Sequence, residues 1–123
     1  NLNIVTFVKK SLEENKRINL VSDQVRMPTF VDDLSRACIT ASEKKVEGVF
    51  NVCGPEQMSY IEIGYRVADF FSLNKGLINH VKTSDLKQKA ERPFKTGFDL
   101  TKSRKILEYS PTNFEKSLSQ IFD

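Results

Sequence analysis

The strongest fold signals in the sequence lie in residues 49–71, VFNVCGPEQMSYIEIGYRVADFF. The apolar run at residues 49–53 is closed by Gly54 and Pro55, which is typical of a buried strand that ends in a turn. Four apolar residues then follow at helical spacing, namely Ile63, Val67, Phe70 and Phe71. This stretch therefore predicts a strand, a turn and an amphipathic helix in succession.

The start of that helix carries two local signals. Ser59 precedes Glu62 by three residues, which is the spacing of a capping box. Met58 and Ile63 occupy the two positions of a hydrophobic staple, in which an apolar residue before the cap packs on one in the next turn. Together these signals predict a helix whose amino-terminal cap is Ser59.

Towards the amino terminus the sequence predicts two helices and two short strands. Apolar residues at helical spacing indicate a first helix that ends near Asn15, and a short strand follows at Ile18–Val21. An irregular link leads into a second short strand at residues 29–31. Asp32 or Asp33 is then expected to cap a helix. The apolar face of this helix is expected at Leu34, Ala37, Cys38 and Ala41.

Towards the carboxyl terminus a strand is expected at residues 78–81, and it leads into a basic loop around Arg92. Two short helices are expected at residues 101–107 and 114–122. Short strands and helices thus alternate along the chain, which predicts an α/β fold. A parallel sheet needs helices on both faces, so the pieces are better explained as a small lobe that packs against another domain.

Length and composition limit the classes of protein to which this chain can belong. At 123 residues the chain is large enough for one small domain, so residues 1–123 are expected to form a single lobe. No apolar run approaches the roughly 20 residues that cross a bilayer, and no signal-peptide pattern opens the chain. The two cysteines are too few for a secreted disulfide scaffold, which favours a reducing cytoplasm. Because the first helix follows Asn1 almost at once, we expect a fragment of a larger protein.

The net charge of +3 is concentrated in one stretch of the chain. Residues 82–105 hold eight Lys and Arg against three Asp and Glu, whereas the other residues hold eleven against thirteen. A local excess of positive charge indicates an anionic partner for this stretch. Lys87 and Lys89 belong to it, and they either extend the positive surface or lie in a solvated loop.

One alternative for this stretch is a small nucleic-acid-binding module. Such a module would need aromatic residues between the basic ones, so that bases can stack on them. Phe94 and Phe98 are present, but no recognised binding motif accompanies them. No nucleic-acid partner is therefore expected, and no membrane partner either.

The chain lacks the residue patterns of an unaided active site. Its five glycines are far apart and form no phosphate-binding loop. His80 is the only histidine and the cysteines have no second pair, so no metal site is expected. Cys38 and Cys53 lie in predicted apolar faces, where a packed core thiol is a better interpretation than a nucleophile. No tyrosine is followed by lysine four positions later, so a Tyr-x-x-x-Lys acid/base pair is missing and no catalytic residue is assigned.

Three segments, in this order, resemble the carboxy-terminal part of extended short-chain dehydrogenases that act on nucleotide sugars. They are RMPTFVDDLSRA at residues 26–37, GVFNVCGPEQMSYIE at residues 48–62 and ERPFKTGFDLTK at residues 91–102. Within this superfamily, the pair Asp23–Gln24 and the run Met27–Thr29 look most like dTDP-4-dehydrorhamnose reductases. Those enzymes reduce the 4-keto group of a dTDP-linked deoxysugar with NAD(P)H. The related nucleotide-sugar epimerases and dehydratases remain an alternative.

The resemblance implies that an amino-terminal Rossmann domain holds the glycine-rich loop, the NAD(P)H cofactor and the Tyr/Lys catalytic pair. This chain would then be a nucleotide-sugar-binding lobe that packs on its own Rossmann domain and is inactive alone. Surfaces that meet that domain would be exposed in isolation, which leaves a homodimer open. A further alternative is a non-catalytic regulatory or scaffolding subunit of the same fold.

The resemblance also indicates which residues bind the substrate. Arg26 begins the first matching segment and Arg92 belongs to the Arg-Pro element of the third, so both are expected along the diphosphate, one from each side. Arginine suits this group because its planar, permanently charged guanidinium donates several hydrogen bonds. Thr29 and Lys95 are expected as further substrate contacts.

Other polar residues have structural interpretations. Asn51 lies inside the predicted buried strand, where its amide must find hydrogen-bond partners, and bracing of the backbone is its expected role. Asp99 and Lys102 are expected to cap the helix at residues 101–107 and to form a local ion pair. Tyr60 could stack on a base, but packing is the better explanation in the first turn of a helix.

Overall fold

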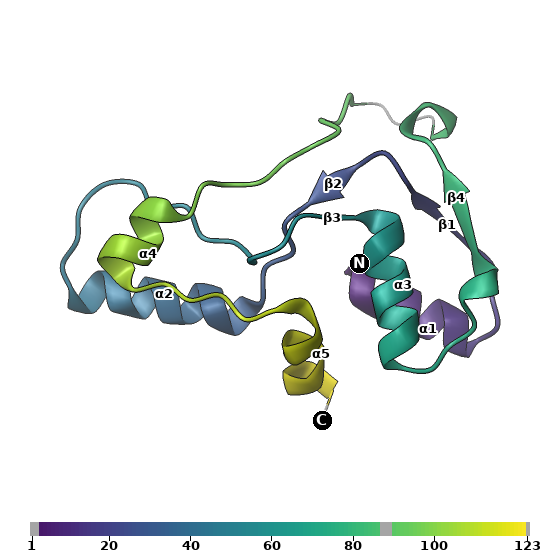
Figure 1. Cartoon of the computed structure of the whole chain (residues 1–123), viewed down its shortest axis with the longest axis horizontal. Coiled ribbons are helices and arrows are strands. Elements are labelled where there is room, and N and C mark those ends of the chain that lie inside the picture. The colour runs from purple at the N-terminus through teal and green to yellow at the C-terminus, as the bar shows by residue number, and fades with distance from the viewer. Residues whose placement is uncertain (1–2, 87–89, 123) are drawn as a thin grey trace. The chain divides into compact units, whose positions relative to one another are not determined.

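The computed structural model describes residues 3–86 and 90–122, along which helices and strands alternate (Figure 1). The elements are α1 (Ile4–Glu13), β1 (Ile18–Val21), β2 (Val25–Arg26), α2 (Val31–Glu43), β3 (Met58–Ser59), α3 (Tyr60–Phe70), β4 (Ile78–Val81), α4 (Thr101–Leu107) and α5 (Phe114–Phe122). Short 3₁₀ turns at Lys75–Leu77 and Thr83–Asp85 flank β4. The predicted α/β class is confirmed, and the two carboxy-terminal helices lie where the sequence places them.

The described residues fall into two compact units. Unit 1 comprises Asn1–Arg26 and Met58–Lys95, and unit 2 comprises Met27–Gln57 and Thr96–Asp123. Each unit is thus built from two segments that are distant in the sequence. The expectation of a single lobe over residues 1–123 stays a prediction.

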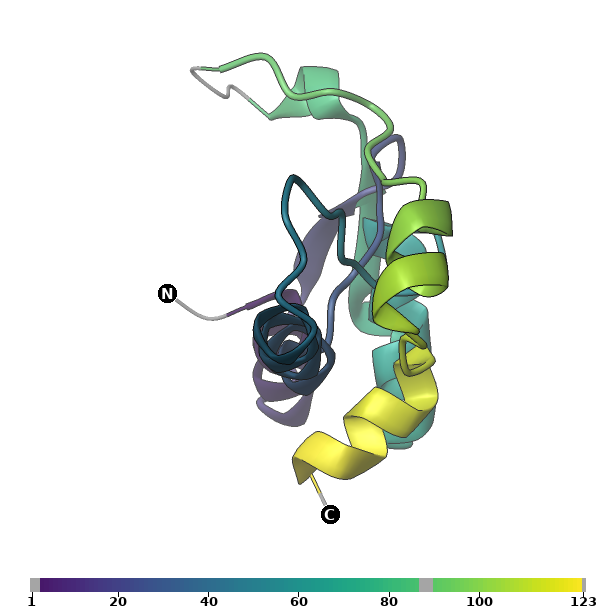
Figure 2. The same ribbon diagram turned by 90° about the vertical axis from the view of Figure 1, so that its left-hand side faces the viewer.

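Unit 1 is organised around two parallel strands and two helices. β1 and β4 pair in register along their whole length, and Figure 1 and Figure 2 show them side by side. α1 and α3 pack against each other and against β1. The packing is close, because a side-chain carbon added at Gly64 of α3 would lie 2.3 Å from a methyl carbon of Leu20 in β1. The predicted first helix and the strands at residues 18–21 and 78–81 are confirmed.

An antiparallel pair of β2 and β3 leads directly into α3. The hydroxyl oxygen of Ser59, the last residue of β3, accepts a hydrogen bond from the backbone N–H of Glu62 at 3.1 Å. This contact satisfies one of the free N–H groups at the helix start. The predicted cap is confirmed, and both residues of the expected staple, Met58 and Ile63, are buried.

The second short strand lies earlier in the chain than the sequence suggested. Residues 29–31 do not form a strand, so that prediction is wrong. β2 is a strand because its backbone pairs with β3, whereas no strand pairs with residues 29–31 in the described ranges. Phe30 is the amino-terminal cap residue of α2, and Asp32 and Asp33 lie in the first helical turn. The expected cap at one of these aspartates is therefore also wrong.

Residues 49–53, the expected buried strand, form no strand either. Three side chains bind carbonyl groups of this segment: Lys102 binds that of Val49, Ser103 that of Asn51, and Tyr109 that of Cys53. Acceptors at every second residue are typical of one side of an extended chain. The backbone groups of Phe50 and Val52 make no hydrogen bond within residues 3–86 and 90–122. The prediction is wrong because a strand forms only beside a paired neighbour. No strand in the described residues pairs with residues 49–53.

Exposure also corrects three residue assignments. Asn51 is exposed, so the expected burial of its amide is wrong. Cys38 is exposed too, so the expected packed thiol is wrong at this position, where the side chain lines an open pocket beside Phe50 and Val52. Leu34, on the same side of α2, is 44% exposed. Cys53 is buried as expected, and burial raises the pKa of its thiol.

The core of unit 2 includes a buried tyrosine. The buried cluster consists of Ala37, Cys53, Leu100, Leu107 and Tyr109. The Tyr109 hydroxyl donates to the Cys53 carbonyl at 2.9 Å. Burial, with a smaller contribution from the charge of Asp33, raises the pKa of Tyr109 to about 12. The hydroxyl therefore keeps its proton, and this donor, at neutral pH.

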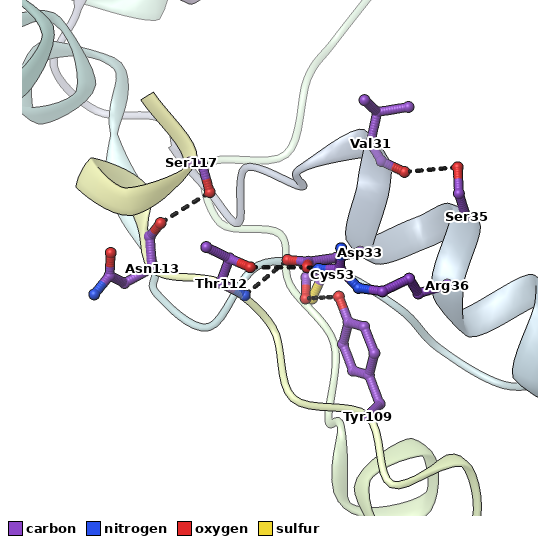
Figure 3. A network of polar contacts seen from close by, with 9 residues as sticks. All are labelled: Val31, Asp33, Ser35, Arg36, Cys53, Tyr109, Thr112, Asn113 and Ser117. Carbon is purple, nitrogen blue, oxygen red and sulfur yellow. Dashed lines mark hydrogen bonds and ion pairs between the residues drawn. The ribbon is translucent and has the colours of Figure 1, made fainter. Parts of the chain in front are cut away.

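A buried aspartate fixes the start of α2 to the segment before α5. The Asp33 side chain is 1% exposed, and it accepts hydrogen bonds from the backbone N–H of Thr112 at 2.7 Å and from its hydroxyl at 2.9 Å. Arg36, one turn along α2, forms an ion pair with the same carboxylate. Figure 3 shows the carboxylate between these two partners. A buried carboxylate with this many donors is a specific tether between distant parts of the chain.

Replacing Asp33 with Ala should lower the free energy of unfolding by about 2–4 kcal/mol, because two hydrogen bonds from Thr112 and the ion pair with Arg36 are lost. Chemical denaturation measures this loss. Asp32→Ala is the matched control, since Asp32 is the exposed neighbour in the same helical turn. Equal losses in the two variants would contradict the tether.

Replacing Ser59 with Ala should destabilise the protein by about 1 kcal/mol, the usual effect of losing an amino-terminal helix cap. Ser59→Asp should retain most of the stability, because its carboxylate can accept the same hydrogen bond and suits the positive end of the helix dipole. Thermal unfolding of the two variants tests the cap. A Ser59→Asp variant as unstable as Ser59→Ala would argue against it.

Candidate functional site

The candidate site is a pocket in unit 1 with a volume of about 920 Å³. It is lined by Asp23, Thr83, Ser84, Leu86, Ala90, Glu91, Arg92, Pro93 and Phe94. The volume lies within the range of small-molecule sites, which is roughly 300–1,000 Å³. The lining combines carboxylates, hydroxyls and one guanidinium, so it suits a ligand that carries both hydroxyl groups and negative charge.

Backbone pairing brings the Arg92 segment to this pocket. The N–H of Val25 in β2 donates to the carbonyl of Phe94 at 2.7 Å, and Val25 also forms a parallel bridge with Lys95. The residues around Arg92 are therefore fixed beside the start of β2. The 3₁₀ turn that follows β4 also contributes to the wall, and it includes Thr83.

A chain of side-chain hydrogen bonds connects the start of β2 to this wall. The Nη2 of Arg26 donates to Oε1 of Gln24 at 2.6 Å, and the Nε2 of Gln24 donates to Oγ1 of Thr83 at 3.0 Å. The Thr83 hydroxyl in turn donates to Oδ1 of Asp23 at 2.7 Å. The backbone N–H of Thr83 also donates to the Asp23 carboxylate, at 3.0 and 3.1 Å. Gln24, in the middle of the chain, is 2% exposed.

The Arg26 guanidinium is held by further contacts in unit 1. Its Nη1 donates to the carbonyl of Val25 at 2.8 Å, and its central carbon lies 5.6 Å from the centre of the Tyr60 ring. A guanidinium over an aromatic face is attracted by the negative charge of the ring face. Tyr60 thus supports Arg26, which agrees with the structural role that its place in the helix favours.

The acidic and basic side chains around the pocket are suited to different groups of a ligand. The hydrogen bonds from Thr83 hold the pKa of Asp23 below its usual range, so this carboxylate is ionised at neutral pH. Glu91 adds a second acidic side chain, whereas Arg92 is the basic residue of the lining. An anionic ligand group is therefore expected at Arg92 and away from Asp23, while ligand hydroxyls can donate to the carboxylates.

The predicted substrate contacts lie in different places. Arg92 is exposed and lines the pocket, while the Arg26 guanidinium is absent from the lining and is joined to it through Gln24. Lys95 is exposed next to Phe94, also in unit 1. Thr29 belongs to unit 2, where its hydroxyl bonds the carbonyl of Met27 at 3.4 Å. Their roles in binding stay predictions.

Separate roles are predicted for Lys87, Lys89, Asp99 and Lys102. Lys87 and Lys89, assigned to the basic stretch, lie outside the described residues. The expectation for Asp99 is half right: Leu100 is the cap residue of α4, but the Asp99 carboxylate supports the helix start. It accepts from the Thr101 hydroxyl at 2.6 Å and from the Thr101 backbone N–H at 2.8 Å, and these bonds lower its pKa. The expected ion pair with Lys102 is wrong, because that ammonium binds the carbonyl of Val49 at 2.8 Å and lies over the Phe50 ring.

Sequence reasoning did not assign a role to Gln24 or Thr83. The available signal was the polar pair Asp23–Gln24, which follows a buried strand after one intervening residue, a place where side chains reach the edge of a sheet. Thr83 gives no such signal, because its role depends on the pairing of β1 with β4. That pairing brings residues 60 positions apart into contact.

Residues 3–86 and 90–122 contain no group of three or more His, Cys, Asp or Glu side chains placed to bind a metal ion. None of the helices within these ranges is both long and apolar enough to span a bilayer.

Comparisons with known proteins relate this chain to one protein family. The family model described as the RmlD substrate binding domain matches residues 1–123. Methionine adenosyltransferase 2 subunit beta of Xenopus laevis is 31% identical over 97 residues, covering 75% of this chain and 29% of that protein. The dTDP-4-dehydrorhamnose reductase of Aggregatibacter actinomycetemcomitans is 26% identical, covering 94% of this chain and 44% of the reductase.

A solved structure has the same fold. The crystal structure of dTDP-4-dehydrorhamnose reductase from Bacillus anthracis, in complex with NADP, matches with a TM-score of 0.85 at 21% identity, covering 99% of this chain and 43% of that one. The chain therefore spans less than half the length of these relatives. Because the family model covers the sequence from its first residue to its last, the chain belongs to the RmlD substrate binding domain family.

Proposed function

We propose that this chain is the nucleotide-sugar-binding lobe of an NAD(P)H-dependent reductase that acts on 4-keto-deoxysugar nucleotides, as dTDP-4-dehydrorhamnose reductases do. The observation that carries the proposal is the pocket in unit 1, where Arg92 stands beside carboxylate and hydroxyl side chains. The family match over the full chain supports it. Residues outside this chain would perform the reduction, and the lobe would be inactive alone.

The pocket chemistry fits the two ends of such a ligand. A diphosphate carries negative charge on the oxygen atoms of two tetrahedral phosphoryl groups, and a planar guanidinium can bind a pair of these oxygens through charge-assisted hydrogen bonds. Sugar hydroxyls are donors, and the carboxylates of Asp23 and Glu91 are acceptors. Binding energy from these non-reacting groups can orient the keto group for reaction elsewhere in the protein.

The nicotinamide cofactor would bind mainly outside these residues. The chain has no glycine-rich loop, and its five glycines stand far apart in the sequence. The partner that supplies this loop would be an amino-terminal Rossmann domain of the same protein, which we place in the cytoplasm. No reaction step is assigned to residues of this chain, whose part is to bind and orient.

Replacing Arg92 with Ala in the full-length protein should weaken the binding of dTDP by about 10- to 100-fold, the effect of losing charge-assisted hydrogen bonds to a phosphate. The affinity for NADPH should change much less, because the cofactor binds elsewhere. Isothermal titration calorimetry measures both. Arg104→Ala is the matched control, since Arg104 is an exposed arginine of the same basic stretch outside the pocket. Unchanged dTDP affinity in Arg92→Ala would remove Arg92 from the site.

A second candidate is a non-catalytic regulatory subunit of the same fold. The match to methionine adenosyltransferase 2 subunit beta is the observation that favours it. A turnover assay distinguishes the two: consumption of NADPH with a dTDP-4-keto-deoxysugar supports the reductase. Absence of turnover in a correctly folded full-length protein that binds another enzyme subunit would favour the regulatory function.

A further inference from the structure

We infer that Gln24 is a positioning residue for nucleotide-sugar binding, because its one amide holds the Arg26 guanidinium and the wall of the pocket that Arg92 lines. The inference rests on the proposed function and assigns it a residue that does not itself line the pocket. A glutamine that is 2% exposed has lost its side-chain freedom and its water, so both ends of its amide need partners. Both ends have them, at 2.6 and 3.0 Å.

The orientation of this amide is fixed by the chemistry of its neighbours. An arginine guanidinium can only donate hydrogen bonds, so the amide oxygen of Gln24 must face Arg26. The amide nitrogen then faces the hydroxyl oxygen of Thr83, and the proton of that hydroxyl is free to bind Asp23. Every hydrogen bond in the chain therefore runs in the same direction, from a cation at Arg26 to an anion at Asp23.

A chain of this kind is stronger than its separate bonds. Donors aligned between a positive and a negative end polarise one another, and the effect is larger where water is excluded. Gln24 is the link that joins the two charged ends. Without its amide, Arg26 keeps the Val25 carbonyl and the Tyr60 ring as contacts, which leave its guanidinium free to turn about the side-chain bonds.

The same position also connects to the Arg92 segment. The backbone carbonyl of Gln24 accepts from the N–H of Tyr60 at 3.3 Å, and the next residue, Val25, binds the carbonyl of Phe94 at 2.7 Å. Thr83, the partner of the Gln24 amide nitrogen, is itself part of the pocket lining. A change at Gln24 thus reaches Arg26 through one hydrogen bond and the pocket wall through another.

The test uses the full-length protein, with dTDP as the probe and NADPH as the internal reference. Gln24→Leu should weaken dTDP binding by about tenfold, close to the effect of one lost charge-assisted hydrogen bond, and should leave NADPH affinity within about twofold. Thr83→Val should also weaken dTDP binding, and Thr83→Ser, which restores the hydroxyl, should recover it. Gln120→Leu is the matched control, because Gln120 is an exposed glutamine of α5.

A double-mutant cycle with Arg26→Ala separates positioning from general stability. If Gln24 acts through Arg26, then adding Gln24→Leu to Arg26→Ala should cost little further dTDP affinity. Losses that multiply in the double variant would show that Gln24 does not act through Arg26, and an equal loss of NADPH affinity in Gln24→Leu would show that Gln24 only supports the fold. Circular dichroism of each variant confirms that the protein being titrated is folded.

The proposed function and the role of Gln24 are contradicted by different results. Unmodified full-length protein that does not bind dTDP would overturn the proposed function, and the inference with it. Protein that binds dTDP normally, and still does so after Gln24→Leu, would overturn the role of Gln24 alone.

Discussion

Unit 1 is arranged around the buried side-chain amide of Gln24. This amide lies between the Arg26 guanidinium and the Thr83 hydroxyl, which in turn binds the Asp23 carboxylate. A buried amide whose two ends are not satisfied costs free energy, so the strands on either side of Gln24 must deliver both an acceptor and a donor. The parallel pairing of β1 with β4 delivers Thr83, and the short strand β2 delivers Arg26. This arrangement shapes the pocket, since Asp23 and Thr83 of the bonded chain line it.

Unit 2 meets a similar constraint with a different group. There the buried acceptor is the Asp33 carboxylate, and its donors come from Arg36 in the same helix and from Thr112, which is 79 positions away. In each unit one buried polar side chain specifies which distant segments must meet. Apolar packing alone would allow the segments to pair in several alternative registers. A buried polar group that needs particular partners allows a single register.

Local patterns in the sequence were enough to locate most elements, and long-range pairing explains the failures. The cap at Ser59, the strands β1 and β4 and the two last helices were predicted correctly, because their signals lie within a few residues. The strand expected at residues 49–53 failed because strand formation depends on a neighbour. At the site, Arg92 could be named from a short motif, but Gln24 acquires its role only when Thr83 is brought to it. The spacing of residues in the sequence does not indicate that contact.

The extended segment at residues 49–53 has a practical consequence for anyone who produces this chain by itself. One of its sides is occupied by Lys102, Ser103 and Tyr109, while the backbone groups of Phe50 and Val52 on the other side are unbonded within the described residues. Unprotected, apolar edges of this kind recruit further copies by hydrogen bonding, which leads to aggregates. In the isolated lobe this segment is the place where a second copy could pair, and a charged side chain in place of the 81% exposed Val49 would act as a gatekeeper against such self-association.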